Sequence, residues 1–217
     1  MIITIDGPAG SGKSSAAKAL AQRLGFEMLD TGATYRAVAL AITRAGVDIG
    51  DAKQLRQLLS TLHIEMPLHR VLLNGEDITA AIRTPDVSVL ASKAAAIGAV
   101  REYLVGLQRE IAHGRNMICE GRDQGTVVFS DATRKFFFVA DRVERARRRL
   151  KELLEKGQNA TLDSVLAEQD ARDQRDASRD NSPLRPAPDA IIIDSTHLTL
   201  EQVLDRMEQE IRPCLSA

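Results

Sequence analysis

A glycine-rich stretch near the N-terminus has the residue types and the spacing of a phosphate-binding loop. Residues 7–14 read Gly-Pro-Ala-Gly-Ser-Gly-Lys-Ser and match the pattern GxxxxGK[ST] at every defined position. In such a loop, backbone N–H groups surround phosphate oxygens, the lysine reaches the outer phosphates, and the following hydroxyl ligates Mg²⁺. The pattern predicts a site for a nucleoside triphosphate and Mg²⁺, with Ser14 as metal ligand, made by Gly7, Pro8, Ala9, Gly10, Ser11, Gly12, Lys13, Ser14 and Ser15.

The phosphate loop alone does not decide the class of nucleotide-binding protein. Switch GTPases read guanine with an Asn-Lys-x-Asp motif. None of the asparagines in this chain is followed by lysine; they are Asn74, Asn116, Asn159 and Asn181. The sequence therefore argues against a GTPase, and other motifs must identify the group that receives the phosphate.

Arginines stand beside acidic or hydroxyl groups after two expected strands. The first motif, at residues 30–36, reads Asp-Thr-Gly-Ala-Thr-Tyr-Arg, and the second, at residues 120–123, reads Glu-Gly-Arg-Asp. The planar guanidinium of arginine binds phosphate through two parallel hydrogen bonds. Both motifs therefore suit an anionic second substrate.

A third motif places Arg172, Asp176 and Arg179 at positions i, i+4 and i+7, which share one face if the stretch is helical. One carboxylate between two arginines suits a sugar hydroxyl, with the cations on phosphate or base edges. A solvated helix surface is the alternative interpretation of this spacing.

The elements that position these motifs alternate between strands and helices. Short apolar runs predict buried strands at residues 1–6, 26–30, 116–120, 135–140 and 190–194. Helical patterns cover residues 13–24, 33–45 and 142–156, and a capping box predicts a last helix from Thr199. This alternation predicts a parallel sheet with helices on both sides and a site beyond the carboxyl ends of its strands.

Two stretches depart from the alternation. Around Asn74-Gly75, a strong hairpin signal predicts a small β insertion at about residues 63–83. Residues 141–185 hold 11 basic and 10 acidic side chains in 45 positions, which indicates either a solvated helical surface or a mobile lid that carries arginines. We expect one domain, with its core at about 1–62, 84–140 and 186–217, the insertion at 63–83 and the lid at 141–185.

Composition limits the other classes of protein. The chain has 29 basic and 30 acidic residues, seven aromatic residues and no Trp, so we expect no nucleic-acid partner. No stretch is long and apolar enough for a membrane span, and we expect no membrane partner. Cys119 and Cys214 form no pairing motif, so we expect a cytoplasmic protein, and we expect it to be a monomer.

Together these motifs resemble those of the bacterial cytidylate (CMP) kinases. The matching stretches are residues 7–14, 30–36, 120–129, 172–179, 182–184 and 189–194. The resemblance implies an α/β P-loop NTPase three-layer fold with a five-stranded parallel sheet, a small β-containing insertion that binds the nucleoside monophosphate (NMP), and a helical lid. It also implies transfer of the γ-phosphoryl group of ATP to CMP or dCMP, with Mg²⁺.

Roles follow from the resemblance position by position. Thr31 is expected in the monophosphate site with Asp123, while Arg36 and Arg122 hold the CMP phosphate. Ser92, Arg101 and Arg179 are expected to contact cytosine, and Asp176 to bind the ribose with Arg172 close by. Arg145, Arg148 and Arg149 are candidates for the ATP phosphates. The expected catalytic set is Lys13, Arg36, Arg122, Arg145 and Arg149.

Three residues differ from the family pattern, and the sequence leaves the Mg²⁺ carboxylate and the function open to alternatives. Ser15, Gln124 and Ser130 differ from residues that the family often has at these positions. The strand ends Glu120, Asp141 and Asp194 each offer a carboxylate to organise Mg²⁺, and Glu120 is favoured by the Gly-Arg-Asp that follows it. The alternative functions are a kinase for UMP, AMP or a small alcohol, and an ATP-binding switch without kinase activity.

Overall fold

The structure is a computed structural model that describes residues 1–67, 70–155, 157–179 and 181–215. The chain forms two compact units. The first comprises Met1–Met28 with Gly114–Ala217, and the second comprises Leu29–His113.

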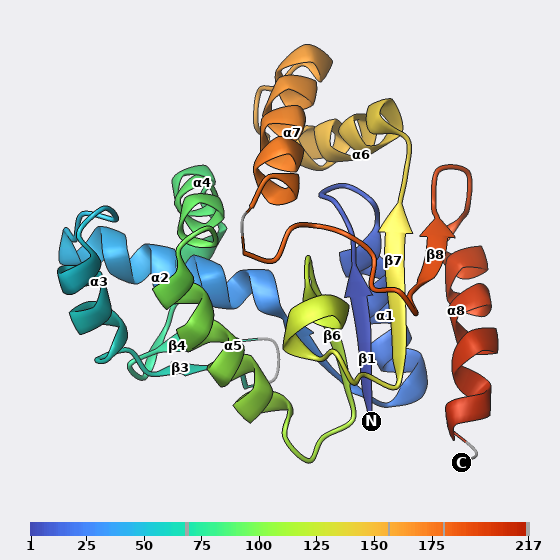
Figure 1. Ribbon diagram of the computed structural model, residues 1–217. Coiled ribbons are helices and arrows are strands. Elements are labelled where there is room, and N and C mark those ends of the chain that lie inside the picture. The colour runs from blue at the N-terminus through green and yellow to red at the C-terminus, as the bar shows by residue number, and fades with distance from the viewer. Residues whose placement is uncertain (68–69, 156, 180, 216–217) are drawn as a thin grey trace. The chain divides into compact units, whose positions relative to one another are not determined.

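The first unit is built on a five-stranded sheet in the order β2-β6-β1-β7-β8 (Figure 1). Its strands are β1 (Ile2–Asp6), β6 (Met117–Gly121), β7 (Arg134–Val139) and β8 (Ile191–Asp194), together with the first two residues of β2 (Glu27–Asp30). The central strand β1 pairs in parallel with β6 and β7, and β7 pairs in parallel with β8. All five predicted strands are confirmed to within one residue at each end.

Side chains of β1 alternate between the two faces of the sheet, as the pleat of a strand requires. Ile3 and Ile5 are fully buried in the apolar core that β7 and β8 form with helices α1 (Lys13–Leu24) and α8 (Leu200–Leu215). Thr4 and Asp6 are also buried but belong to the opposite face. The central strand therefore carries a polar face that ends at the phosphate loop.

Local capping explains where these helices begin and end. Gly25 closes α1 in the left-handed conformation, with φ of 66°. Before α8, the hydroxyl of Thr199 accepts from the backbone N–H of Gln202, and the Gln202 side chain accepts from the backbone N–H of Thr199. The predicted capping box is therefore confirmed.

The lid region of the first unit contains helices α6 (Arg142–Glu155) and α7 (Leu162–Ala177). Figure 1 shows them beyond the arrowheads of β1 and β7. Asp141 caps α6 by accepting from the backbone N–H groups of Val143 and Glu144. The predicted last residue of this helix, Lys156, lies outside the described residues.

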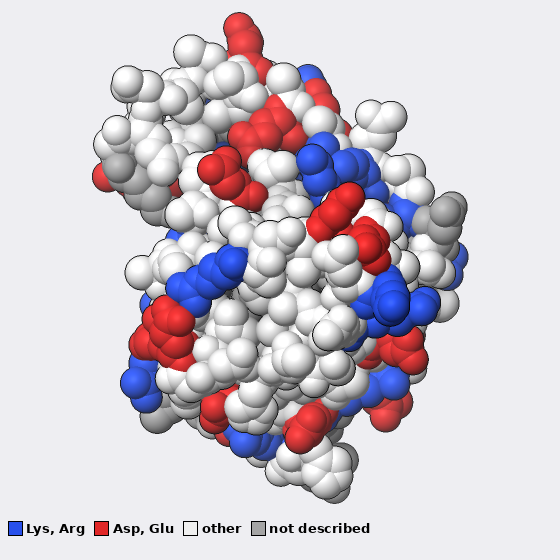
Figure 2. Space-filling model, turned by 90° about the vertical axis from the view of Figure 1, so that its left-hand side faces the viewer, with Lys and Arg blue, Asp and Glu red and all other residues white. Residues whose placement is uncertain are grey.

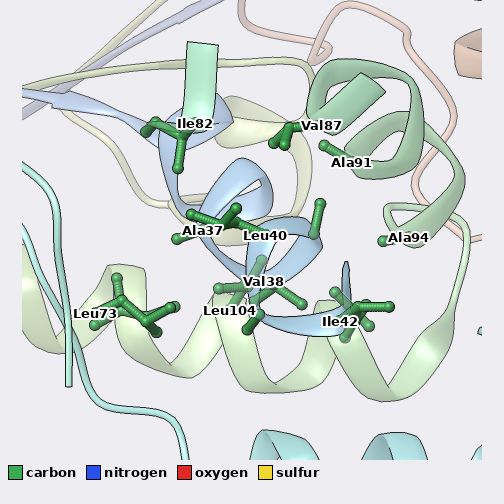
Figure 3. Close-up of a cluster of buried hydrophobic side chains, with 14 of the residues drawn as sticks. Ala37, Val38, Leu40, Ile42, Leu73, Ile82, Val87, Ala91, Ala94 and Leu104 are labelled. Atoms are coloured by element: carbon green, nitrogen blue, oxygen red, sulfur yellow. The ribbon is translucent and has the colours of Figure 1, made fainter. Parts of the chain in front are cut away.

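The second unit packs helices around its own core. Its helices are α2 (Thr31–Ala45), α3 (Ala52–Leu59), η1 (Ala81–Arg83), α4 (Pro85–Ala94) and α5 (Gly98–Ala112). Figure 3 shows Val38 and Ile42 of α2, Ala91 of α4 and Leu104 of α5 meeting in this core. Helix α2 begins two residues earlier than predicted, because the Asp30 carboxylate accepts from the backbone N–H of Ala33 over 3.0 Å.

The β insertion predicted in residues 63–83 is a small antiparallel sheet in the second unit. Its strands are β3 (Ile64–Glu65), β4 (Leu72–Leu73) and β5 (Glu76–Asp77). Asn74 and Gly75 join β4 to β5 with φ of 50° and 83°. Positive φ at both central residues is the requirement of a type I′ hairpin, so the Asn-Gly signal is confirmed.

Charges of both signs are mixed on the surface. On the described part of the face drawn in Figure 2, Lys and Arg lie among Asp and Glu rather than in a field of one sign. Within the described ranges, no helix is long and apolar enough to span a membrane.

Candidate nucleotide-binding site

The phosphate loop joins the end of β1 to the start of α1. Gly7, Gly10 and Gly12 have φ of 147°, 75° and 82°, which L side chains rarely adopt. The loop also lies against backbone: a Cβ on Gly7 would be 2.5 Å from the carbonyl oxygen of Phe138. The residue before α1 is Gly12, which has no side chain to cap the helix N-terminus. Glycines and an uncapped helix N-terminus are what a loop needs to bind phosphate through its backbone.

Replacing Gly7 with alanine is expected to lower the free energy of unfolding by about 1–3 kcal/mol, since φ and the Phe138 carbonyl both oppose a Cβ. Urea denaturation measures this change. Gly98→Ala is the matched control, because a Cβ at Gly98 meets nothing within 4 Å. Its effect is expected to stay below about 1 kcal/mol in either direction. Equal effects of the two substitutions would contradict the close approach at Gly7.

Lys13, Ser14 and Glu120 form a polar cluster between the loop and the end of β6. Nζ of Lys13 lies 3.2 Å from Oε1 of Glu120, and the Ser14 hydroxyl donates to Oε2 over 3.0 Å. Burial, and next the positive charge of Arg122, lowers the pKa of Lys13 to about 8. A phosphate beside Nζ would favour the charged lysine, so the cluster suits the binding of an anion.

Arg145 of α6 lies against the phosphate loop. It is 7 % exposed, and its Nη1 donates to the carbonyl oxygen of Ala9 over 3.1 Å. Its Nη2 pairs with Asp173 of α7 at 2.7 Å. A Cβ on Gly10 would be 2.9 Å from the Arg145 carbonyl oxygen. The start of the lid region is thus packed on the loop.

The two other lid arginines differ in their surroundings. Arg148 donates to the carbonyl oxygens of Ser195 and Thr196, over 2.7 and 3.2 Å, in the segment that follows β8. Arg149 instead pairs with Glu152 of its own helix at 3.1 Å and is about half exposed. The structure therefore brings Arg145 and Arg148 to the loop and its neighbour segment, whereas Arg149 pairs along α6.

A cavity of about 220 Å³ adjoins the loop within the first unit. Ser11 and Gly12 line it from the loop, Arg148 from α6, Leu198 from the segment after β8, and Leu200 from the start of α8. Ser195 fastens this segment to the loop, since its hydroxyl donates to the carbonyl oxygen of Ser11 over 2.8 Å. Apolar walls with a few fixed polar groups suit a flat aromatic group.

Arg122, Asp176 and Arg179 form a buried ionic group. Nε of Arg122 lies 2.9 Å from Oδ2 of Asp176, and Arg179 bonds to Oδ1. Asp176 is 1 % exposed. Burial alone would raise the pKa of Asp176, but Arg122, Arg179 and Arg172 together hold it below its usual value. The predicted shared helical face is wrong for Arg179, because α7 ends at Ala177 and Arg179 reaches Asp176 from the chain beyond it.

Asp123 is buried in the first unit, and four other predicted residues lie in the second unit. Arg36 pairs with Asp30 at 2.8 Å, and Thr31 is buried at the start of α2. Arg101 is 5 % exposed and donates to the hydroxyl of Tyr35 over 3.2 Å. Ser92 of α4 is buried as well. Ser92 and Arg101 are therefore buried polar groups and not ordinary helix surface.

Comparison with protein families decides what this chain is related to. The model of the cytidylate kinase family, described as "Cytidylate kinase", matches residues 3–213. The chain belongs to the cytidylate kinase family. It is 49% identical to the cytidylate kinase of Geobacter sulfurreducens, covering 98% of this chain and 93% of the relative. It is 46% identical to that of Thermotoga maritima, covering 97% of this chain and 96% of the relative.

Solved structures agree on the fold. A shikimate kinase from Bacteroides thetaiotaomicron has a TM-score of 0.50 at 14% identity, covering 98% of both chains. An uncharacterized protein from Eubacterium ventriosum has a TM-score of 0.56, also at 14% identity and 98% coverage of both chains. The α/β P-loop kinase fold predicted from the sequence is confirmed.

Three polar residues around the candidate site were not among the predicted site residues. Asp6 ends the central strand directly before the loop, and Ser195 follows the last strand; a polar residue at a strand's carboxyl end is a signal that finds both. Asp173, the partner of Arg145, has no such signal, because it is one of many charged residues on α7.

Proposed function

We propose that this chain transfers the γ-phosphoryl group of ATP to CMP or dCMP, giving ADP and CDP or dCDP. The observation that supports this most is the cluster of Lys13, Ser14 and Glu120, which stands at the phosphate loop while Arg122 follows Glu120 by two residues. Lys13, at the start of α1, would serve the donor phosphates, and Arg122, directly after β6, would serve an acceptor phosphate. Membership of the cytidylate kinase family supports the choice of acceptor.

The donor ATP is proposed to lie along the first unit. Its phosphates would lie in the loop from Gly7 to Ser14, against the N-terminus of α1. Its adenine would occupy the cavity beside Arg148, whose guanidinium is already held by two carbonyl oxygens. Arg145 reaches the phosphates from the start of α6, exchanging part of its contact with Asp173 for them, and Arg149 would join after leaving Glu152.

The residues present also fit Mg²⁺. The hydroxyl of Ser14 and the carboxylate of Glu120 are hard oxygen donors 3.0 Å apart. Mg²⁺ is usually held by one or two protein oxygens together with substrate phosphates and water, so a larger protein cage is not needed. When bound, Mg²⁺ would neutralise charge on the outer phosphates of ATP.

Roles toward the acceptor are proposed for the residues of each unit by itself. In the first unit, Arg122 would hold the CMP phosphate with Asp123, Asp176 the ribose hydroxyls with Arg172, and Arg179 the base. In the second unit, Thr31 and Arg36 would serve the phosphate, and Ser92 and Arg101 the base. Asp176 suits a sugar hydroxyl because its lowered pKa keeps it an ionised acceptor.

The proposed reaction needs no general base, because the attacking oxygen belongs to a phosphate that is already ionised at neutral pH. Catalysis then consists of positioning and charge stabilisation. Lys13 and Arg145 would stabilise charge on the transferred group, and Arg36 and Arg122 would orient the attacking phosphate. Closure of the region from Asp141 to Arg185 would exclude water, which otherwise takes the phosphoryl group.

A coupled assay of ADP release from ATP tests the proposal, run with CMP, dCMP, UMP and AMP, each with Mg²⁺ and with a chelator. We expect CMP and dCMP to stimulate ADP release most strongly, and the chelator to abolish the stimulation. Stimulation by UMP or AMP alone would change the acceptor. If none of the four nucleotides stimulates ADP release, the kinase proposal fails and the ATP-binding switch is favoured.

The oligomeric state and the cellular compartment of the chain are also proposed. We propose a monomer in the cytoplasm that acts on free nucleotides. Cys119 and Cys214 are both free, which suits a reducing compartment. Light scattering in solution tests the monomer, and a dimer at assay concentrations would overturn it.

A further inference from the structure

The carboxylate of Asp6 binds the turn that carries the acceptor-side residues of the first unit. Its Oδ1 accepts from the backbone N–H of Gln124 over 2.9 Å, and its Oδ2 accepts from that of Gly125 over 2.7 Å. These N–H groups begin the single helical turn Gln124–Val128. The first N–H groups of such a turn have no partner within it, so Asp6 supplies the acceptors that the turn lacks.

The turn is also pressed onto the polar face of the sheet. A Cβ on Gly125 would be 2.9 Å from Oγ1 of Thr4 and 3.2 Å from Cδ of Lys135. Gly125 is therefore the residue that lets the backbone approach β1 and β7 closely enough to reach Asp6. The side chains of Thr4 and Asp6 are almost fully buried beneath it.

Arg122 and Asp123 stand between two fixed points. The strand β6 holds the chain up to Gly121, and Asp6 holds it again from Gln124. Only Arg122 and Asp123 lie between these anchors, so their backbone direction depends on both. Burial raises the pKa of Asp6 to about 7, although the hydrogen bonds from Gly125 and Gln124 lower it. Burial therefore destabilises the ionised carboxylate, and the two hydrogen bonds offset part of this cost.

We propose that Asp6 is a positioning residue for the acceptor: it fixes the turn after β6 and thereby aims Arg122 at the phosphate of the nucleoside monophosphate. This inference rests on the proposed function of the chain. Asp6 directly precedes the phosphate loop, yet its carboxylate accepts hydrogen bonds from Gln124 and Gly125, in the turn that follows Arg122. Its loss should therefore affect CMP more than ATP.

Steady-state kinetics of Asp6→Asn tests the proposal. The amide keeps one acceptor but turns an N–H toward the N–H of Gly125, which releases one anchor of the turn. We expect kcat/KM for CMP to fall by about 10-fold or more through misplacement of Arg122. The KM for ATP is expected to change by less than about twofold, because the loop itself is untouched. A change in the KM for ATP as large as the change in kcat/KM for CMP would overturn the proposal, since it would indicate a distorted loop.

A second series keeps Asp6 and moves the turn. Gly125→Ala is expected to reproduce the selective loss with CMP, because its Cβ pushes the turn away from Thr4. Thr4→Ala alone is expected to be close to the wild type. The double variant Thr4→Ala/Gly125→Ala is expected to recover part of the lost kcat/KM for CMP, because removing Oγ1 relieves the 2.9 Å contact, whereas the 3.2 Å contact with Cδ of Lys135 remains.

The outcomes separate the inference from the proposed function. If the wild-type chain shows no CMP-dependent ADP release, the proposed function fails. If it does and both Asp6→Asn and Gly125→Ala keep the wild-type kcat/KM for CMP, only the positioning role fails. Should Asp6→Asn not fold, as circular dichroism would show, the Gly125 series decides: recovery in the double variant supports the role of the turn, and no recovery overturns it.

Discussion

Replacing Lys13 with alanine is expected to lower the turnover of CMP phosphorylation by roughly 10²-fold or more. Lys13 is the only cation of the loop motif, and Nζ already stands at the Glu120 carboxylate and the Pro8 carbonyl oxygen, at the mouth of the loop. An ammonium in a buried site interacts strongly with charge that develops on a transferred phosphoryl group. The initial rate of ADP release at saturating ATP and CMP measures the effect.

Lys18→Ala is the matched control, because Lys18 is an exposed lysine of the same helix, α1. Its turnover is expected to stay close to that of the wild type. Thermal unfolding of both variants accompanies the kinetics, since Glu120 loses its buried partner in Lys13→Ala. A folded Lys13→Ala variant with near-normal turnover would defeat the assignment of the loop.

The fold could be predicted from motifs of only a few consecutive residues. The loop motif sets the start of α1 and Gly25 its end, while the Asn74-Gly75 turn sets the small β sheet. The central strand is readable because Ile2, Ile3 and Ile5 make residues 1–6 a short apolar, β-branched run before the motif. Such features need no knowledge of distant contacts.

The contacts of the buried site residues could not be predicted, because they join residues that are distant in the sequence. Ser92 lies on α4 and Arg101 on α5, where polar side chains usually face solvent, yet both are buried. The pairing of Asp6 with Gln124 joins positions 118 residues apart, and that of Arg122 with Asp176 joins positions 54 apart. Only the resemblance to the family marked Ser92 and Arg101 as candidates, and nothing in the local pattern marked Asp173.

Replacing Asp176 with asparagine is expected to lower the free energy of unfolding by about 3 kcal/mol at neutral pH, because it leaves the guanidinium groups of Arg122 and Arg179 without their buried counter-charge. The same change is expected to raise the KM for CMP by about 10-fold or more, since a charged acceptor for a sugar hydroxyl is lost. Urea denaturation and steady-state kinetics measure the two effects.

Asp170→Asn is the control on the same helix, because Asp170 pairs with Arg142 in an exposed ion pair, with side-chain exposures of 44% and 54%. Its cost is expected to stay below about 1 kcal/mol. Arg122 and Arg179 hold the pKa of Asp176 below its usual value, so the carboxylate contributes its stability above the unfolded-state pKa of about 3.9 and loses it as pH falls through the lower folded-state pKa. The difference between the wild type and Asp176→Asn should therefore be constant near neutral pH and shrink in acid. A difference that stays the same at every pH would mean that lost packing, and not lost charge, destabilises the variant.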